Sequence, residues 1–253
     1  MTRLFRDIFP PVVVLLAVIA ATELTVARGW IAPYLVPRPT QILAATVENA
    51  RELFTATAST TTAAMAGFLL SACVGVSLAI VLSAGGWVQR AFYPYAVFFQ
   101  TVPIIAIAPL LVIWFGFDAR AVIASSFIVS VFPVIANTLT GLRSTDPALR
   151  DLFRLYGAGP VASLCKLRIP FAAPSIFTGL RVAAGLAVIG TIVGEFIVGT
   201  GLGGLIVVAR REQRVDKVFA ILLLSAALGI VLFTLVNTAG RLVMRRWHAS
   251  EIE

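Results

Sequence analysis

Residues 146–170 read DPALRDLFRLYGAGPVASLCKLRIP and form a polar stretch between two strongly apolar segments. Asp146 is a favourable N-cap residue, and Pro147 occupies the first helical position, where its missing N–H costs nothing. Asp151 and Arg154 stand three residues apart and can pair on the polar side. The apolar residues recur at i, i+3, i+4 and i+7, so they line one face of a helix: Leu149, Leu152, Phe153 and Tyr156. This stretch therefore predicts a short amphipathic helix with its own start signal.

A glycine turn divides the stretch into two parts. Gly157 stands where a left-handed C-cap is expected, and Gly159-Pro160 begins a second short helix. Pro170 disfavours helical geometry at Ile169, which predicts that the second helix ends there. The predicted unit is a helix, a glycine turn, a second helix and a proline, placed between membrane spans.

The composition is that of a polytopic helical membrane protein. Of the 253 residues, 59% are hydrophobic and 13% are charged, and the mean hydropathy is +0.97, whereas a soluble domain is about 25% charged. The formal charge of +8 lies in loops and at the ends, as membrane topology requires, which argues against nucleic-acid binding. Two cysteines and a single histidine give no pattern for a disulfide framework or a metal site.

Several segments reach the roughly 20 apolar residues that a helix needs to cross about 30 Å of hydrocarbon. There are six of them: 10–28, 60–85, 92–116, 120–142, 171–198 and 218–243. The third contains Pro94, Pro103 and Pro109, so we expect it to be kinked or broken and to face protein or a cavity rather than lipid. The sequence predicts an all-α transmembrane bundle of about six spans, forming one domain over residues 1–253.

The basic residues indicate the orientation. With the N-terminus inside, twelve of the 20 Lys and Arg residues lie on the cytoplasmic side and eight outside. Both termini and residues 143–170 are then cytoplasmic. Residues 199–217 lie outside in this scheme, although GLGGLIVVA is apolar enough to re-enter the membrane, and a count of five or seven spans stays open.

The sequence contains one apparent nucleotide-binding signature and lacks another. Gly199-Thr-Gly-Leu-Gly-Gly204 matches G-x-G-x-x-G, but a long apolar helix precedes it where a dinucleotide site needs a strand. A glycine-rich bend is the favoured interpretation. The chain has no G-x-x-x-x-G-K-[ST] motif, so any ATP that drives its function is bound by another polypeptide.

Polar groups in the apolar runs are candidates for a translocation pathway or gate. Glu195 is an intramembrane carboxylate, and such a group indicates function by default; the equally weighted alternative is that it reaches the outer interface or caps the glycine-rich turn. Gln100, Thr101 and Pro103 are further candidates in the third span. For Gln100 and Thr101, hydrogen bonding between helices is the favoured alternative.

A face of small residues on the fifth span is suited to close helix approach, and it consists of Ala183, Ala187, Gly190 and Gly194. The sequence leaves open whether this face packs within the chain or across a dimer.

The stretch 146–170 resembles a cytoplasmic loop in the membrane subunits of binding-protein-dependent ABC importers. That loop has E-A-A, three residues, G, nine residues and I-x-L-P; here the matching residues are Asp151-Leu152-Phe153, Gly157 and Leu167-Arg168-Ile169-Pro170. The likeness extends over nearly the whole chain, to PTQILAAT, PIIAIAPLLVIWFGFD, and APSIFTGLRVAAGL followed by Gly194-Glu195. The chain looks like the nitrate, sulfonate and taurine type, whose relatives include importers assigned to pyrimidine vitamin precursors. Asp-Leu-Phe departs from the family pattern by placing bulk where alanines usually stand.

This resemblance implies a type I importer permease in the bacterial inner membrane. It implies a homodimer that works with two ABC ATPase subunits and an external substrate-binding protein, and that holds no cofactor because the partner binds ATP. The chain would form the pathway for a small organic or oxyanion solute without being an enzyme itself. The residues expected to couple it to the ATPase are Leu149, Asp151, Leu152, Phe153, Tyr156, Gly157 and Pro170.

Alternatives remain both for the apolar stripe and for the function of the chain. The apolar stripe of the 146–170 helix can enter a groove on the ATPase, pack on the chain's own helices, or do part of each. A secondary transporter would carry internal repeats and intramembrane ion sites, and an integral membrane enzyme would need a catalytic cluster. The sequence supplies little of either.

Overall fold

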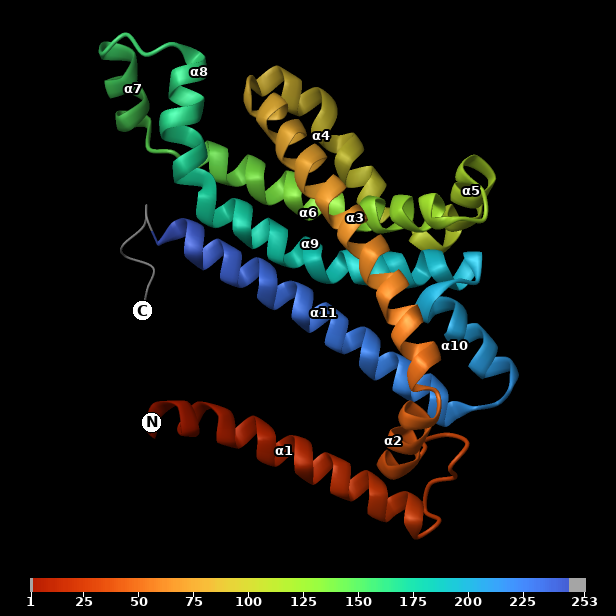
Figure 1. Ribbon diagram of the computed structural model, residues 1–253. Coiled ribbons are helices and arrows are strands. Elements are labelled where there is room, and N and C mark those ends of the chain that lie inside the picture. The colour runs from red at the N-terminus through yellow and green to blue at the C-terminus, as the bar shows by residue number, and fades with distance from the viewer. Residues whose placement is uncertain (1, 246–253) are drawn as a thin grey trace.

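The computed structural model describes residues 2–245, without the side chains of residues 2–8, 88, 89, 92, 96, 99 and 100. Within this part of the chain there is no strand, and the helices are joined by short connections except at residues 28–38, between the first two helices (Figure 1). They are α1 (Thr2–Ala27), α2 (Pro39–Glu48), α3 (Ala50–Ser83), α4 (Gly86–Thr101), α5 (Ile104–Phe115), α6 (Ala119–Arg143), α7 (Pro147–Leu155), α8 (Pro160–Ser163), η1 (Leu164–Arg168), α9 (Ile169–Val198), α10 (Gly201–Arg211) and α11 (Val215–Met244).

The all-α membrane architecture predicted from composition is confirmed. Among the described residues, five helical segments are long and apolar enough to cross a bilayer: Phe9–Ala27, Ala50–Ser83, Ala119–Arg143, Pro160–Val198 and Val215–Met244. The predicted third span is broken, because Val102 and Pro103 are extended, with ψ of 124° and 122°, between α4 and α5. Pro103 lacks an N–H and restricts the residue before it, which is why the helix stops at this point.

Pro170 does not end a helix, so that part of the sequence prediction is wrong. Ile169 is helical, with φ −66° and ψ −49°, and α8 continues through η1 into α9. The turn before the proline widens to a π-helix, in which the N–H of Ile169 donates to the carbonyl of Leu164. The wider turn shifts the hydrogen-bond register where the proline ring would otherwise clash with the preceding turn.

The core of the bundle is the contact between α6 and α9, with α3 packed against both. Gly190 lies against Ser125 and Ser126, and a Cβ on it would meet the Ser125 carbonyl oxygen at 2.8 Å and the Ser126 Cα at 2.9 Å. The Ser125 hydroxyl donates to the Gly190 carbonyl at 2.8 Å, and the Ser126 hydroxyl donates to the Ala187 carbonyl at 2.9 Å. The small-residue face of the fifth span therefore packs within the chain.

The two ends of the bundle carry different elements (Figure 1). The α7–α8 unit projects at the end where α1 begins and α11 finishes, whereas α2 and α10 lie at the opposite end. Helix α10 has 11 residues, too few to cross a bilayer, and packs against α3, α9 and α11. Helix α1 stands apart from the main bundle, packs chiefly on α2, and leaves most of its apolar surface uncovered.

The α6–α9 contact generates a stability prediction with a matched control. Gly190→Ala should lower the free energy of unfolding by about 1–3 kcal/mol, because the added methyl meets the α6 backbone. Gly185→Ala, on the same helix, should be neutral or stabilising by about 1 kcal/mol, because a Cβ there meets nothing within 4 Å. Thermal unfolding in detergent measures both, and equal effects would contradict the assigned contact.

Candidate functional site

Helix α7 has the cap at each end that the sequence predicts. The Asp146 carboxylate accepts from the Ala148 backbone N–H at 2.8 Å. At the other end Gly157 has φ +71°, and the N–H groups of Gly157 and Ala158 donate to the carbonyls of Arg154 and Phe153, both at 2.9 Å. These two bonds form a Schellman closure, which requires the left-handed glycine. Both ends of this short helix are therefore capped by hydrogen bonds.

The apolar stripe of α7 lies largely uncovered. No residue of the helix is buried; Leu152 is 44% exposed and Tyr156 is 84% exposed. Leu149 is also exposed, whereas Phe153 is half-buried. On the polar side, the predicted pair forms, with Arg154 and Asp151 joined at 3.1 Å. Because water penalises exposed apolar surface, this stripe is a candidate docking surface.

Two arginines attach the coupling segment, defined here as residues 146–170, to the ends of the long helices. Arg150 donates through Nη2 to the carbonyl of Arg143 at 2.8 Å. Arg168 donates through Nε to the carbonyl of Leu142 at 3.2 Å and through Nη2 to that of Ser83 at 3.4 Å. The carbonyls at a helix C-terminus lack partners within the helix and attract cations. Sequence reasoning did not assign this role, because it depends on where α3 and α6 end in space.

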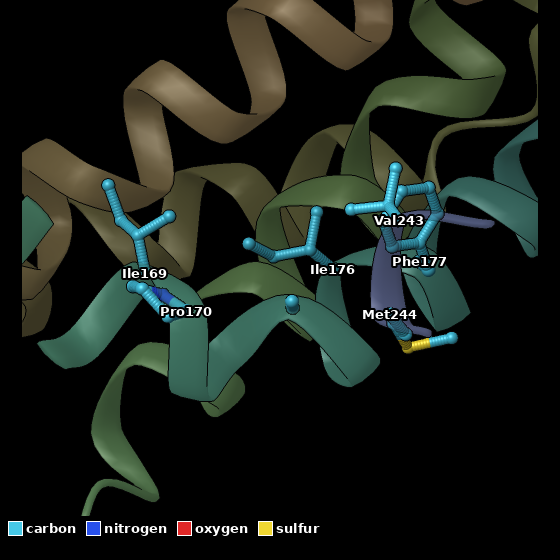
Figure 2. Close-up of a pocket in the computed structure, with 7 residues that line it drawn as sticks. Ile169, Pro170, Ile176, Phe177, Val243 and Met244 are labelled. Atoms are coloured by element: carbon cyan, nitrogen blue, oxygen red, sulfur yellow. The ribbon is translucent and has the colours of Figure 1, made fainter. Parts of the chain in front are cut away.

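Pro170 borders a small apolar pocket between the start of α9 and the end of α11. Figure 2 shows six of its side chains labelled, four from α9 and two from α11. The pocket has a volume of about 290 Å³ and is lined by Ile169, Pro170, Ala173, Ile176, Phe177, Val243 and Met244. Pro170 therefore lies at the junction where η1 continues into α9, with one side of the proline facing this pocket.

Glu195 caps α10 at the opposite end of the bundle, as one of the sequence-based alternatives proposed. The carboxylate is 1% exposed and accepts from the Thr60 hydroxyl at 2.8 Å and from the Gly203 N–H at 3.0 Å. The Thr60 oxygen in turn accepts from the Leu202 N–H at 3.0 Å. A buried carboxylate at a helix N-terminus satisfies orphan donors and complements the helix dipole. Thr60, which sequence reasoning did not single out, completes the cap from α3.

The glycine-rich bend is shaped by this cap. Gly201 has φ +57°, and a Cβ on it would collide with the Glu195 carboxylate. A Cβ on Gly203 would collide with the backbone of α9. Helices lie on both sides of the bend, so its G-x-G-x-x-G pattern serves close packing and not a dinucleotide site.

The remaining pathway candidates lie at the break between α4 and α5. Thr101 donates to the Phe98 carbonyl at 2.8 Å and is exposed, and Pro103 precedes the first residue of α5; the side chain of Gln100 is outside the described part. Next to this break is an apolar cavity of about 620 Å³, lined by residues of α3, α4, α5 and α6, Trp114 among them, and by Val102 from the break itself. Thr101, Pro103 and Glu195 are not among the residues that line this cavity, and Glu195 lies apart from the break, in the cap of α10, so the structure does not bring the pathway candidates together in one site.

The arrangement is that of a membrane transport subunit, with broken and packed spans and a capped amphipathic helix projecting from one end. The family described as binding-protein-dependent transport system inner membrane component matches residues 71–248, more than half of the chain. The chain belongs to this family. It is therefore a multi-pass inner-membrane permease of an ABC importer, a transport subunit and not an enzyme, and its system includes an ATPase and a substrate-binding protein.

Individual relatives agree with this family. The chain is 36% identical over 207 residues to the formylaminopyrimidine transport permease protein ThiX of Halalkalibacterium halodurans, covering 81% of this chain and 83% of that protein. It is 29% identical to the putative aliphatic sulfonates transport permease protein SsuC of Escherichia coli, covering 91% and 87%. A crystal structure of an amino acid ABC transporter has the same fold, with a TM-score of 0.62, 16% identity, and coverage of 79% of this chain and 96% of that one.

The Glu195 cap generates a prediction about α10. Glu195→Ala leaves the Thr60 hydroxyl and the Gly203 N–H without their acceptor, and each loss should cost about 1–3 kcal/mol. Amide hydrogen exchange in residues 201–211 should then become faster. Glu212→Ala, at the exposed C-terminal end of the same helix, is the control and should leave exchange unchanged. Unaltered protection in the Glu195 variant would contradict the capping role.

Proposed function

We propose that the coupling segment docks on the ATPase subunit through the exposed stripe of α7 and transmits ATP-driven motion to the membrane helices. The observation that carries this proposal is an apolar stripe left uncovered on a helix that is capped at both ends. An amphipathic helix of this kind suits an apolar groove on a partner. Leu152 and Phe153 are bulkier than the usual alanines, so the groove would be correspondingly wider on this chain's own ATPase.

The coupling segment has a direct connection to the spans. Arg150 and Arg168 join it to the C-terminal ends of α3 and α6, and η1 continues it into α9. A displacement of α7 would therefore move three of the long helices together. This is the property that a coupling device requires, because energy released at the ATPase has to reach the pathway as a change of helix positions.

The assembly that we propose is a homodimer of this chain with two ATPase subunits. Both termini and residues 143–170 face the cytoplasm, in agreement with the basic residues near α7 and at the end of α11. Gln100, Thr101, Pro103 and Glu195 remain candidates for the pathway or its outer gate; Glu195 would act there by fixing α10.

For the solute we propose a formylaminopyrimidine-type compound, with aliphatic sulfonates as the second candidate. The support is the higher identity to the ThiX permease than to the SsuC permease, each over most of both chains. Uptake of each labelled compound by the complete importer in proteoliposomes tests the assignment. Transport of neither would exclude both.

The left-handed turn of α7 generates a coupling prediction. Gly157→Val should leave membrane insertion intact but uncouple uptake from ATP hydrolysis, because a Cβ at φ +71° costs about 1–2 kcal/mol and disturbs the cap. Gly159→Val is the matched control, since Gly159 has an ordinary φ of −66°. Uptake and ATPase rates in proteoliposomes measure the effect, and normal uptake by the Gly157 variant would rule out the coupling role of this turn.

The exposed stripe generates a docking prediction. Replacing both Leu152 and Tyr156 by serine removes apolar surface worth about 2–4 kcal/mol when buried, so copurification of the ATPase should fall by at least about tenfold. Val47→Ser, at a 70% exposed site on α2 at the other end of the bundle, should have no effect. Undiminished copurification of the double variant would show that the stripe is not the docking surface.

A further inference from the structure

A single arginine stands deep within the fifth span. Arg181 is the thirteenth residue of α9, Ile169–Val198. At about 1.5 Å per residue, it lies roughly 18 Å from the inner end of this helix and roughly 25 Å from the outer end. The basic-residue count assigns Arg181 to the cytoplasmic side, and its position on α9 corrects this, because the depth is close to the middle of a bilayer. A charged side chain is costly there and has to face protein or water.

Arg181 is not neutralised by the part of the chain that the structure describes. Its Nε is buried and has no hydrogen-bond partner, and no ion pair involves this side chain. Arg168, by contrast, donates through Nε to a helix carbonyl, and Arg150, whose Nε is also unpaired, donates through Nη2 to the Arg143 carbonyl. The carboxylate of Glu195 lies on the same helix but is engaged by Thr60 and Gly203. The guanidinium of Arg181 therefore has unused donors.

The side of α9 next to Arg181 is open. Thr178 is exposed one turn before it, and Val182 is 47% exposed. One turn after it, a Cβ on Gly185 would meet nothing within 4 Å. The opposite side of the helix, with Ala183 and Ala187 at 0% exposure, is the one that packs in the core. The chain thus buries the side of α9 that carries Ala183 and Ala187, and it leaves the side next to the Arg181 guanidinium uncovered.

Lipid is a poor occupant for that bare side, because an unpaired guanidinium requires water or polar partners at this depth. A water-filled pathway meets the requirement. A guanidinium presents five N–H donors in a planar fork, and this geometry suits carboxylate-like or sulfonate oxygens and, with fewer bonds, a formyl carbonyl.

The structure assigns to Arg181 the role of a solute-contacting residue at mid-membrane, which binds the oxygen-bearing group of the solute as it passes along α9. This role rests on the proposed import of a formylaminopyrimidine or a sulfonate. Thr178 and Gly185 flank the guanidinium on the pathway side, and the missing side chain at Gly185 leaves room for the solute.

The first experiment needs no knowledge of the solute. Thr178→Cys and Gly185→Cys are introduced separately, after Cys73 and Cys165 have been replaced by serine, and reacted with an anionic sulfonatoethyl and a cationic trimethylammonioethyl methanethiosulfonate. We expect both positions to be labelled, with the anionic reagent favoured by about tenfold, since a nearby fixed charge in a partly aqueous site contributes on the order of 1–2 kcal/mol. Adding Arg181→Gln should abolish this preference.

The control for labelling is Glu212→Cys, an exposed site just after α10 and outside the membrane spans, where Arg181→Gln should not alter the ratio of the two reagents. Absence of labelling at both α9 positions, or a preference that survives Arg181→Gln, would overturn the assignment. Neither result depends on docking of the ATPase, so failure here is distinguishable from failure of the coupling proposal.

The second experiment measures uptake by the complete importer in proteoliposomes, with formylaminopyrimidine and taurine as the two solutes. Arg181→Gln should reduce uptake of the transported solute by at least about tenfold, as expected for loss of a charge-assisted bond, and Arg181→Lys should restore part of it. Arg241→Gln, which removes an exposed guanidinium from α11, should have no effect. Full uptake by Arg181→Gln would overturn the assignment, and the solute that loses uptake identifies which oxygen-bearing group is recognised.

Discussion

The close contact between α6 and α9 is the constraint on which the rest of the structure depends. Glycine and alanine on α9 let the two backbones approach until serine hydroxyls on α6 donate directly to α9 carbonyls. Between membrane helices there is little hydrophobic driving force, so dense packing and such hydrogen bonds have to hold them together. Because α9 is fixed against α6, the elements at its two ends are fixed as well. These are the coupling segment at one end and the Glu195 cap of α10 at the other.

This arrangement makes α9 a continuous connection through the protein. From Pro160 to Val198 the chain stays helical, since the π turn before Pro170 accommodates a proline that would otherwise break it. At one end, Arg168 holds the connection against the ends of α3 and α6. At the other, Glu195 fixes the N-terminus of α10 together with Thr60. Residues 146–170, α9 and the start of α10 are therefore linked through continuous helix and hydrogen bonds from one end of the bundle to the other.

The coupling segment was predicted in most of its local detail, because its signals are local. The cap at Asp146, the left-handed turn at Gly157 and the Asp151–Arg154 pair each involve residues close in sequence. The exception is Pro170. A proline usually ends the helix before it, but here the chain forms a π turn and the helix continues. The family, too, was predicted from the sequence, through the resemblance of residues 146–170 to a loop of importer permeases, and the match over residues 71–248 confirms the family.

By itself, the sequence determined the all-α membrane architecture, the approximate positions of five spans, and the break of the predicted third span at Pro103, because hydrophobic length and backbone chemistry act locally. Only the tertiary structure decided what the polar groups do. Thr60 and Glu195 are 135 residues apart, and Arg168 reaches Ser83 from 85 residues away. The proposed role of Arg181 depends on the absence of a hydrogen-bond partner for its Nε and of an ion pair among the described residues. Such roles arise when separate helices are packed together, and no pattern within one helix encodes them.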